Sequence, residues 1–432
     1  MPESPYSVME NKLWRSRSDV SGEATPRRMD MPLKHKNISL FGYGKTTRAL
    51  AKKLGPCTFY DDNVSKPHKD SEGNMLRPSC EFEANYSDCE IPSPGMAPSH
   101  PLILQAKNLI SEYDYFSDTM PPSVWISGTN GKTTTTQMIQ TLLAPHGSQA
   151  GGNIGTPLAE LDENASLWIL ESSSFTLHYT NKAVPQVYVL LPITPDHLYW
   201  HGSMRAYEEA KLKPLGMMSE GNAVIIPKKY ENYPSKAMKI TYETNEDLAH
   251  YFEIDASRLR FKGAFLQDAL LALGVSKILF DECDYDRINA MPLDAHRQEE
   301  VRDKNGRLWV NDSKATNLDA TVQALLSYKE HPLSLILGGD DKGVDLRPLF
   351  EVLQEFDVLV YAIGKNENRL LELSHEFSIE AVGCQTLETA CKKIRSEKDQ
   401  QRTVLLSPAA ASLDQFDSYG HRGDEFKKFA KL

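Results

Sequence analysis

The residues best suited to chemistry are 127–134, which read Ser-Gly-Thr-Asn-Gly-Lys-Thr-Thr and follow the apolar run 124–126. Glycines bring backbone N–H groups close to phosphate oxygens, a helix N-terminus favours negative charge, and a lysine reaches terminal phosphates. The next residues, 135–143, have a helical pattern. We therefore predict a site for MgATP or a close relative. A glycine-rich turn without a ligand is the alternative, and the general P-loop pattern would place another glycine where Ile126 stands.

Further polar clusters follow strand-like runs downstream. A glycine turn spans 151–155, the apolar run 168–170 ends at Glu171, and the run 187–191 leads to Asp196 and His197. A carboxylate and an imidazole at strand ends beside a phosphate site are candidate Mg²⁺ ligands, although each could equally be a capped strand end. His197 and His201 have helical spacing, but no Glu follows His197, which argues against a zinc peptidase.

Apolar runs that end in polar residues also occur at residues 38–61 and in the last third of the chain. Residues 38–41 form an apolar run before a Gly-Tyr-Gly turn at 42–44, and Asp61 ends the next apolar run. This pattern is typical of nucleotide-binding folds, and a tight turn that binds no ligand is the alternative interpretation. In the last third, the apolar runs 309–310, 335–337 and 404–406 each end in Gly, Ser, Asp or Lys. Parallel strand ends converge on one crevice, so we predict one shared site there, with solvated loops as the alternative.

The composition of the chain limits the classes of protein to which it can belong. The chain has 432 residues, a net charge of −11 and six scattered cysteines. We expect reduced thiols in a cytoplasmic protein, small-molecule partners, a monomer, and no binding to nucleic acid or membranes, since no apolar run of about 18 residues stands out. Strands alternating with helices predict an α/β fold of parallel sheets. We predict a disordered arm or leader at 1–36 and domains at 37–120, 121–293 and 294–432.

The ordered motifs resemble the Mur ligases from about residue 37 to the C-terminus. The resemblance rests on these motifs: Gly-Thr-Asn-Gly-Lys-Thr at 128–133, Gly-Gly-Asn-Ile-Gly at 151–155, Glu-Ser-Ser-Ser-Phe at 171–175, Asp196-His197, Ala210-Lys211-Leu212, His296-Arg297, Asn-Asp-Ser-Lys-Ala-Thr-Asn at 311–317 and Ser-Pro-Ala-Ala-Ala-Ser-Leu-Asp-Gln-Phe at 407–416. It implies three domains: a Rossmann-like domain for a UDP substrate, a central ATP-binding domain, and a Rossmann-like C-terminal domain for the incoming amino acid.

The resemblance also implies an activity. The last two motifs are most similar to the family member that adds D-glutamate to UDP-N-acetylmuramoyl-L-alanine in peptidoglycan synthesis. In that reaction a carboxylate attacks the γ-phosphate of ATP, and the amine of D-glutamate then displaces phosphate. Two Mg²⁺ ions and a carbamylated Lys211 are implied as well, because a carbamate offers the oxygen ligands that a hard metal prefers.

Site residues carry over by position. The resemblance implies catalytic roles for Lys132, His197 and Lys211. It implies these binding sets: for ATP, Gly128, Thr129, Asn130, Gly131, Lys132, Thr133, Thr134, Arg297, Asp312 and Lys314; for the UDP substrate, Thr46, Asp61, Ser93, Pro94, Gly95 and Asn153; for D-glutamate, Thr316, Lys342, Ser412, Leu413 and Tyr419; for metal, Thr133, Glu171, His197 and Lys211.

The chain departs from the family pattern where an Asn usually contacts adenine, since the corresponding stretch is 263–268, Gly-Ala-Phe-Leu-Gln-Asp. Three rival functions stay open. The first is a P-loop kinase or ATPase acting on a small acceptor, and the second is a sister ligase adding another amino acid, such as a folylpolyglutamate synthase. The third is a nonenzymatic dinucleotide sensor built on Gly42 and Gly44.

Overall fold

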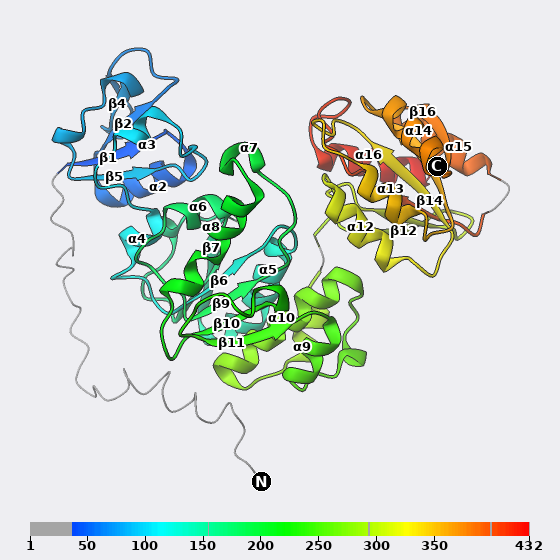
Figure 1. Cartoon of the computed structure of the whole chain (residues 1–432), viewed down its shortest axis with the longest axis horizontal. Helices are drawn as coiled ribbons and strands as arrows, with labels where there is room; N and C mark the ends of the chain where they lie inside the picture. Colours follow the sequence, from blue (N-terminus) through cyan, green and yellow to red (C-terminus); the bar gives the residue numbers. More distant parts are fainter. Residues whose placement is uncertain (1–36, 154, 293, 398–399, 432) are drawn as a thin grey trace, which may run out of the picture. The chain divides into compact units, whose positions relative to one another are not determined.

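The computed structural model describes residues 37–153, 155–292, 294–397 and 400–431. The predicted arm at 1–36 lies outside these residues. The chain divides into two compact units. The first comprises the described residues up to Arg260 together with Gln267–Ala290, and the second comprises Phe261–Leu266 and the described residues from Met291 onward. Each unit is described by itself below, and Figure 1 shows the elements of both.

The first unit begins with a five-stranded sheet in the order β3-β4-β2-β1-β5. All neighbours are parallel except β3, which pairs antiparallel with β4. Apolar side chains from β1 and β2 alternate between the faces, so Leu40 and Phe59 are fully buried in the core shared with the next sheet. The strands are β1 (Ile38–Phe41), β2 (Thr58–Asp61), β3 (His68–Lys69), β4 (Met75–Pro78) and β5 (Cys89–Pro92).

The second sheet of this unit has six strands, all parallel, in the order β11-β10-β9-β6-β8-β7. Its central strands are buried along their whole length, as continuous apolar runs of a parallel sheet covered on both faces require. The phosphate-binding motif follows its central strand β6. The strands are β6 (Ser123–Ser127), β7 (Ser148–Gly152), β8 (Leu167–Glu171), β9 (Val187–Leu190), β10 (Ala223–Pro227) and β11 (Met238–Tyr242).

The second unit contains one six-stranded sheet in the order β12-β13-β17-β14-β15-β16. Only β12 is antiparallel to its neighbour. Strand β17 lies between β13 and β14, so the order of the strands along the chain changes direction there. A crevice for ligands is expected at the carboxyl ends of these strands. The strands are β12 (Glu299–Arg302), β13 (Leu308–Asn311), β14 (Leu333–Gly338), β15 (Val358–Ile363), β16 (Glu380–Gln385) and β17 (Thr403–Leu406). The predicted α/β class with mainly parallel sheets is therefore confirmed.

Helices connect the strands and cover the sheets (Figure 1). The main helices are α2 (Lys45–Leu54), α3 (Pro101–Gln105), α4 (Glu112–Phe116), α5 (Lys132–Leu143), α6 (Ser174–Tyr179), α7 (Leu198–His201), α8 (Met204–Met217), α9 (Asn245–Tyr251), α10 (Gly263–Phe280), α11 (Tyr285–Ala290), α12 (Leu318–Ser327), α13 (Arg347–Leu353), α14 (Glu367–Glu376), α15 (Leu387–Ser396) and α16 (Tyr419–Lys431).

Helix α10 departs from the expectation that no apolar run is long enough to cross a membrane. It has 18 residues with a mean hydropathy of 1.5, so its length and composition alone would allow it to cross a membrane. However, 61% of the helix is buried inside the protein, and Leu270, Leu271 and Leu273 are completely buried. The run is apolar because it is a core helix surrounded by protein.

One buried carboxyl group makes stability depend on pH. Glu112 stands at the start of α4, with Oε1 accepting a hydrogen bond of 3.4 Å from the N–H of Ala159, and burial raises its pKa to about 8. The folded state binds this proton more tightly than the unfolded state does. The stability of the fold therefore falls as pH rises from the unfolded pKa of 4.5 towards the folded pKa of about 8, because ionising the buried carboxyl group is costly.

We therefore expect Glu112→Gln to be more stable than the wild type at pH 8 and equal to it at pH 4. The upper limit of the gain is about 5 kcal/mol, from a shift of a few pKa units. Denaturant melts of both proteins at the two pH values measure it. A constant difference across this range would contradict the assignment.

Candidate active site

The phosphate loop, residues 127–134, has a backbone that demands glycine at two positions. Gly128 and Gly131 have φ of +140° and +82°. A Cβ on Gly128 would lie 2.4 Å from Cβ of Leu191, and one on Gly131 would lie 2.7 Å from Oδ1 of Asp268. Any side chain at either position would therefore clash. The loop then enters α5 at Lys132, so its backbone N–H groups lie at a helix N-terminus, which favours an anion.

The polar side chains of this loop suit a phosphate. Lys132 Nζ donates to the carbonyl oxygens of Gly128 at 3.1 Å and Thr129 at 2.7 Å, which holds the ammonium group over the loop. The hydroxyl of Thr134 is buried without a hydrogen-bond partner. A buried polar atom with no partner is costly, so it marks a place where a ligand or water fits. Asn130 lies half-buried in the same loop.

Glu171, at the end of β8, is held by residues from two other segments. Its Oε2 accepts a hydrogen bond of 2.8 Å from the Thr133 hydroxyl, and its Oε1 accepts one of 2.7 Å from Nδ2 of Asn153. The predicted metal ligands Thr133 and Glu171 therefore lie together. Asn153, expected beside the UDP substrate, contacts the same carboxylate in this structure.

Lys211, on α8, is the predicted catalytic residue with the most unusual environment. Its side chain is buried, with 1% exposure, and Nζ donates to the carbonyl of Gly128 at 2.7 Å and to the hydroxyl of Ser127 at 3.4 Å. Burial, and then the positive charge of Lys132, hold the pKa of Lys211 well below its usual range. The residue is thus no part of a solvated helix face, and its amine points into the phosphate loop.

His197 begins α7 in a left-handed conformation, with φ of +52°. Its Nε2 lies 3.4 Å from Oδ2 of Asp196, and its ring packs at 4.8 Å against Phe175 of α6. A non-glycine residue in this conformation is strained, and such strain is concentrated at functional sites. Among the described residues, no group of three or more His, Cys, Asp or Glu side chains is arranged to hold a metal ion.

Two side chains that the sequence did not single out support this region. The Tyr207 hydroxyl lies 3.1 Å from Oγ1 of Thr129, and Lys211 Nζ stands 4.8 Å from the centre of its ring. Asp268 of α10 accepts a hydrogen bond of 2.9 Å from Thr135 and lies against Gly131. Two features of the sequence could have revealed them. Tyr207 lies four residues before Lys211, and Asp268 is a carboxylate inside an apolar run.

The predicted UDP-substrate residues gather at the carboxyl ends of β1, β2 and β5. Oδ2 of Asp61 accepts a hydrogen bond of 2.7 Å from the N–H of Tyr43, in the glycine turn. A Cβ on Gly42 would lie 3.2 Å from the side chain of Ser93, so the two turns are in close contact. Thr46 is the second residue of α2. The carbonyl of Gly95, after Ser93 and Pro94, accepts a hydrogen bond from Trp200 of α7.

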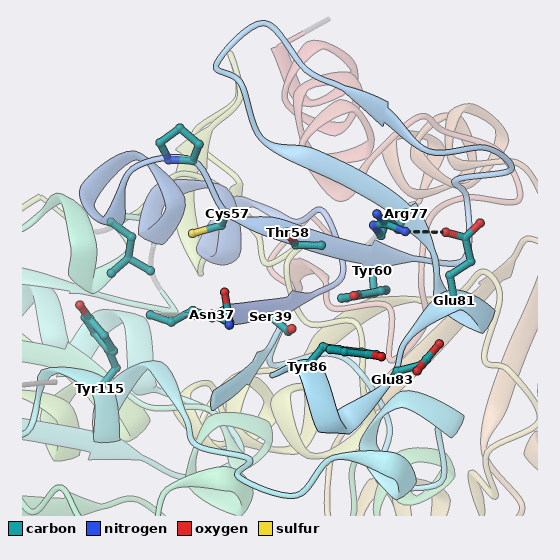
Figure 2. Close-up of a pocket in the computed structure, with 13 residues that line it drawn as sticks. Asn37, Ser39, Cys57, Thr58, Tyr60, Arg77, Glu81, Glu83, Tyr86 and Tyr115 are labelled. Carbon is teal, nitrogen blue, oxygen red and sulfur yellow. Dashed lines mark hydrogen bonds and ion pairs between the residues drawn. The ribbon is translucent and has the colours of Figure 1, made fainter. Parts of the chain in front are cut away.

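A cavity of about 560 Å³ lies elsewhere on the first sheet (Figure 2). Its lining extends along the sheet from Ile38 and Thr58, which begin β1 and β2, to Tyr60 and Arg77, near the carboxyl ends of β2 and β4. Tyr60, Tyr86 and the ion pair of Arg77 with Glu81, at 3.1 Å, line it. None of the predicted site residues lines this cavity. Because its lining includes none of them, we do not assign this cavity to the active site.

In the second unit, the predicted ATP residues Arg297, Asp312 and Lys314 lie around the end of β13. Asp312 accepts hydrogen bonds from the hydroxyl of Ser407 at 2.9 Å and from the N–H of Gln298 at 3.2 Å. Burial raises its pKa to about 7, although the charge of Arg297 opposes the shift. Arg297 and Lys314 both approach Oδ2 of Asp294, at 3.8 and 3.5 Å.

The predicted D-glutamate residues follow neighbouring strands of the same sheet. Lys342 has φ of +53° and lies in the turn after β14, where Asp340 pairs with Ala411 through two backbone hydrogen bonds of 3.0 Å. Ser412 follows and is buried, whereas Leu413 is 71% exposed. Two more members lie at the end of β13 and on α16: Thr316, whose N–H donates to the Lys314 carbonyl, and Tyr419, whose ring lies 5.8 Å from Lys314 Nζ.

Arg422, on α16, was missed by the sequence analysis. It is almost fully buried and donates to the hydroxyl and carbonyl of Ser313 and to the carbonyl of Ala410. Its guanidinium therefore ties the segment after β13 to the segment after β17. No local pattern distinguishes this arginine from a surface residue of an amphipathic helix, so only the three-dimensional packing reveals it.

Comparison with known proteins agrees with this geometry. Residues 126–269 match the family model described as Mur ligase middle domain. A UDP-N-acetylmuramoylalanine--D-glutamate ligase from Campylobacter jejuni (strain 81-176) is 52% identical over 90% of this chain and 98% of its own length. The ligase of that name from Helicobacter pylori (strain HPAG1) is 47% identical over 91% and 99%. Among solved structures, MurF from Acinetobacter baumannii superimposes with a TM-score of 0.58 at 14% identity, covering 91% of this chain and 90% of its own.

The three-sheet fold and the phosphate loop are those expected of an ATP-dependent ligase of the Mur type. Within that class, the chain belongs to the family of UDP-N-acetylmuramoylalanine--D-glutamate ligases, as its identity to two such relatives over nearly their full lengths shows. It is therefore an enzyme of peptidoglycan synthesis that uses ATP. The structural likeness to MurF, at 14% identity, adds only the fold.

Proposed function

We propose that the chain adds D-glutamate to UDP-N-acetylmuramoyl-L-alanine through an acyl phosphate, with the residues predicted from the sequence in the roles given there. The observation that carries the proposal is the phosphate loop. Lys132 and the buried Lys211 both point at the Gly128 carbonyl of this loop, in a chain 52% identical to a ligase named for that reaction.

In the first step, the carboxylate of the UDP substrate attacks the γ-phosphorus of ATP, the bond to the β-phosphate oxygen breaks, and ADP leaves. Two anions must approach one another, so catalysis consists mainly of positioning and charge neutralisation. Lys132 neutralises the phosphates, with residues 128–134 wrapping them. Arg297, Asp312 and Lys314 contribute to ATP binding.

Two Mg²⁺ ions are part of the proposal. Thr133 and Glu171, which share a hydrogen bond of 2.8 Å, would hold one, and His197 and Lys211 would hold or support the other. Hard oxygen ligands suit Mg²⁺, which usually keeps several waters and binds substrate phosphates, so a small number of protein ligands is sufficient. When bound, the ions supply positive charge that offsets the charge of the transferred phosphoryl group.

Carbamylation fits the environment of Lys211. Burial lowers the pKa of Lys211 and so favours the uncharged amine, and this form can attack CO₂ and release a proton to give a carbamate. Lys211 is buried beside the phosphate loop, where a neutral amine or an anion near Lys132 is less costly than a second cation.

In the second step, the amine of D-glutamate attacks the acyl carbon. The tetrahedral intermediate collapses as the bond to phosphate oxygen breaks, and the amine gives up a proton. Lys342 would pair with a carboxylate of D-glutamate by charge. The remaining contacts to D-glutamate fall to Thr316, Ser412, Leu413 and Tyr419, while Thr46, Asp61, Ser93, Pro94, Gly95 and Asn153 bind the UDP substrate. We further propose a cytoplasmic monomer acting on small molecules, without nucleic-acid or membrane partners.

The test is a screen of acceptors with MgATP and UDP-N-acetylmuramoyl-L-alanine. We expect phosphate release to require D-glutamate, with L-glutamate and neutral amino acids giving less than about a tenth of the rate, because a neutral side chain offers Lys342 no carboxylate and the opposite configuration of L-glutamate places its carboxylate elsewhere. ATP hydrolysis or acceptor phosphorylation without D-glutamate would favour a kinase or ATPase. Turnover of L-glutamate on a folate would favour the folylpolyglutamate synthase reading, and NAD binding would favour the sensor.

A further inference from the structure

The first turn of α2 carries an unusual charge pattern. Lys45 is its first residue, Arg48 follows within the same turn, and no acidic residue is present there. The N-terminus of a helix bears partial positive charge, so cations in this position are unfavourable and an anion nearby is favourable. The Asp61 carboxylate is directed at the glycine turn that precedes the helix, where its oxygens accept hydrogen bonds from the N–H of Tyr43 and from Asn63.

The two cations have different surroundings. Arg48 is directed back along the helix, with Nε donating to the carbonyl of Gly44 and the guanidinium 5.3 Å from the ring centre of Tyr43. Lys45 is exposed and reaches outward, and its Nζ donates to the carbonyl of Gly155. The ammonium of Lys45 is therefore the cation that a ligand between these segments can reach.

Three turns meet at Lys45. The glycine turn at 42–44 touches the turn at 93–95, because a Cβ on Gly44 would lie 3.2 Å from Oγ of Ser93. Through Gly155, Lys45 also contacts the segment that carries Asn153. These turns contain Ser93, Pro94, Gly95 and Asn153, four of the six residues proposed for the UDP substrate, and all of them belong to the first unit. A neutral carbonyl is a weaker partner for an ammonium group than a phosphate oxygen is.

We propose that Lys45 binds the diphosphate of the UDP-linked substrate and thereby sets the affinity for it, exchanging the Gly155 carbonyl for a phosphate oxygen. This role rests on the proposed function and adds a residue that the motifs did not assign. The chemical group recognised is a nucleoside diphosphate. Lys45 strengthens binding through charge and takes no part in bond making.

The experiment compares Lys45→Met with the wild type. We expect the KM for UDP-N-acetylmuramoyl-L-alanine to rise about 10- to 100-fold, the range of a charge-assisted hydrogen bond, while the KM for ATP and D-glutamate change less than about twofold. UDP and uridine serve as inhibitors that compete with this substrate. Only UDP carries a diphosphate, so comparing the two distinguishes the loss of a charge contact from a displacement of the binding turns. The inhibition constant of UDP should rise at least about tenfold and that of uridine should stay unchanged. Lys45→Arg should keep most of the affinity for UDP.

Lys52→Met is the matched control, because Lys52 lies on the same helix, is 62% exposed and approaches Glu72 at 3.8 Å, near the other helix end. It should leave every constant unchanged. An unchanged KM in Lys45→Met would overturn the proposal. Equal weakening of UDP and uridine would also overturn it, because Lys45 would then only hold the two turns together. If the wild-type enzyme itself failed to use the UDP substrate, the proposed function would fall, whereas direct titration of the wild type and Lys45→Met with UDP and uridine by calorimetry would still decide the role of Lys45.

Discussion

Lys132→Ala is expected to lower kcat by about a thousandfold or more while the protein stays folded, as is typical when a positioned charge at a transferring phosphoryl group is lost. The structural basis is that Lys132 makes its hydrogen bonds to carbonyls of its own loop, at 3.1 and 2.7 Å, and belongs to no core cluster among the described residues. Its removal therefore deletes charge at the phosphate site with little effect on packing.

The measurement combines steady-state kinetics with a thermal melt of the same sample. The melting temperature should change by only a few degrees, since a variant outside the core usually alters stability by about 1 kcal/mol or less. Lys132→Arg keeps the charge but not the point geometry of an ammonium group, so it should be intermediate. A folded Lys132→Ala enzyme with normal turnover would show that residues 127–134 do not bind the reacting phosphates.

The phosphate loop was predictable because its requirements are local. The left-handed φ of Gly128 and Gly131 and the helix beginning at Lys132 are properties of eight consecutive residues, which the sequence displays directly. The convergence of strand ends was predictable for a different reason, since a parallel sheet places every carboxyl end on one edge. Glu171, the last residue of β8, meets Thr133, at the start of the helix after β6, because those two strands are neighbours.

What escaped prediction depends on partners distant in sequence. Lys211 was assigned through the resemblance alone, because the charged sequence around it is equally compatible with a solvated helix face, and only folding brings its amine to Gly128, 83 residues away. Asp268 and Arg422 are likewise defined by contacts that no periodicity encodes. The apolar helix α10 was overlooked because Gln267 and Asp268 interrupt its pattern, although its later leucines are fully buried. The predicted domain boundaries remain predictions.

Lys211→Ala gives the second large effect, because here a lysine is expected to act as an anion. If Lys211 served only as a surface cation, its loss would cost a few tenths of a kcal/mol and leave activity intact. Its 1% exposure and its hydrogen bond to the Gly128 carbonyl argue against that reading. With a carbamate supplying an oxygen near Mg²⁺, we expect turnover to fall by about a thousandfold, comparable with losing another charge-stabilising group.

Two further measurements separate the carbamate from a purely structural lysine. Formate or acetate should restore part of the activity of Lys211→Ala, because a small carboxylate fits the vacated space and offers equivalent oxygens. Wild-type enzyme incubated with ¹³C-labelled CO₂ should show a carbamate resonance that Lys211→Ala lacks. Both follow from the same chemistry, and the second does not depend on turnover.

Lys213 provides the matched control on the same helix. Its Nζ donates to the carbonyl of His178 at 2.8 Å and to Oδ1 of Asn181 at 2.7 Å, both away from the phosphate loop. Lys213→Ala should therefore lose some stability, about 1–2 kcal/mol for two hydrogen bonds, yet retain near-normal turnover. Full activity in Lys211→Ala would remove the carbamate from the mechanism. An inactive Lys211→Ala without rescue, together with an unlabelled wild type, would reduce Lys211 to a buried amine that holds the loop at Gly128.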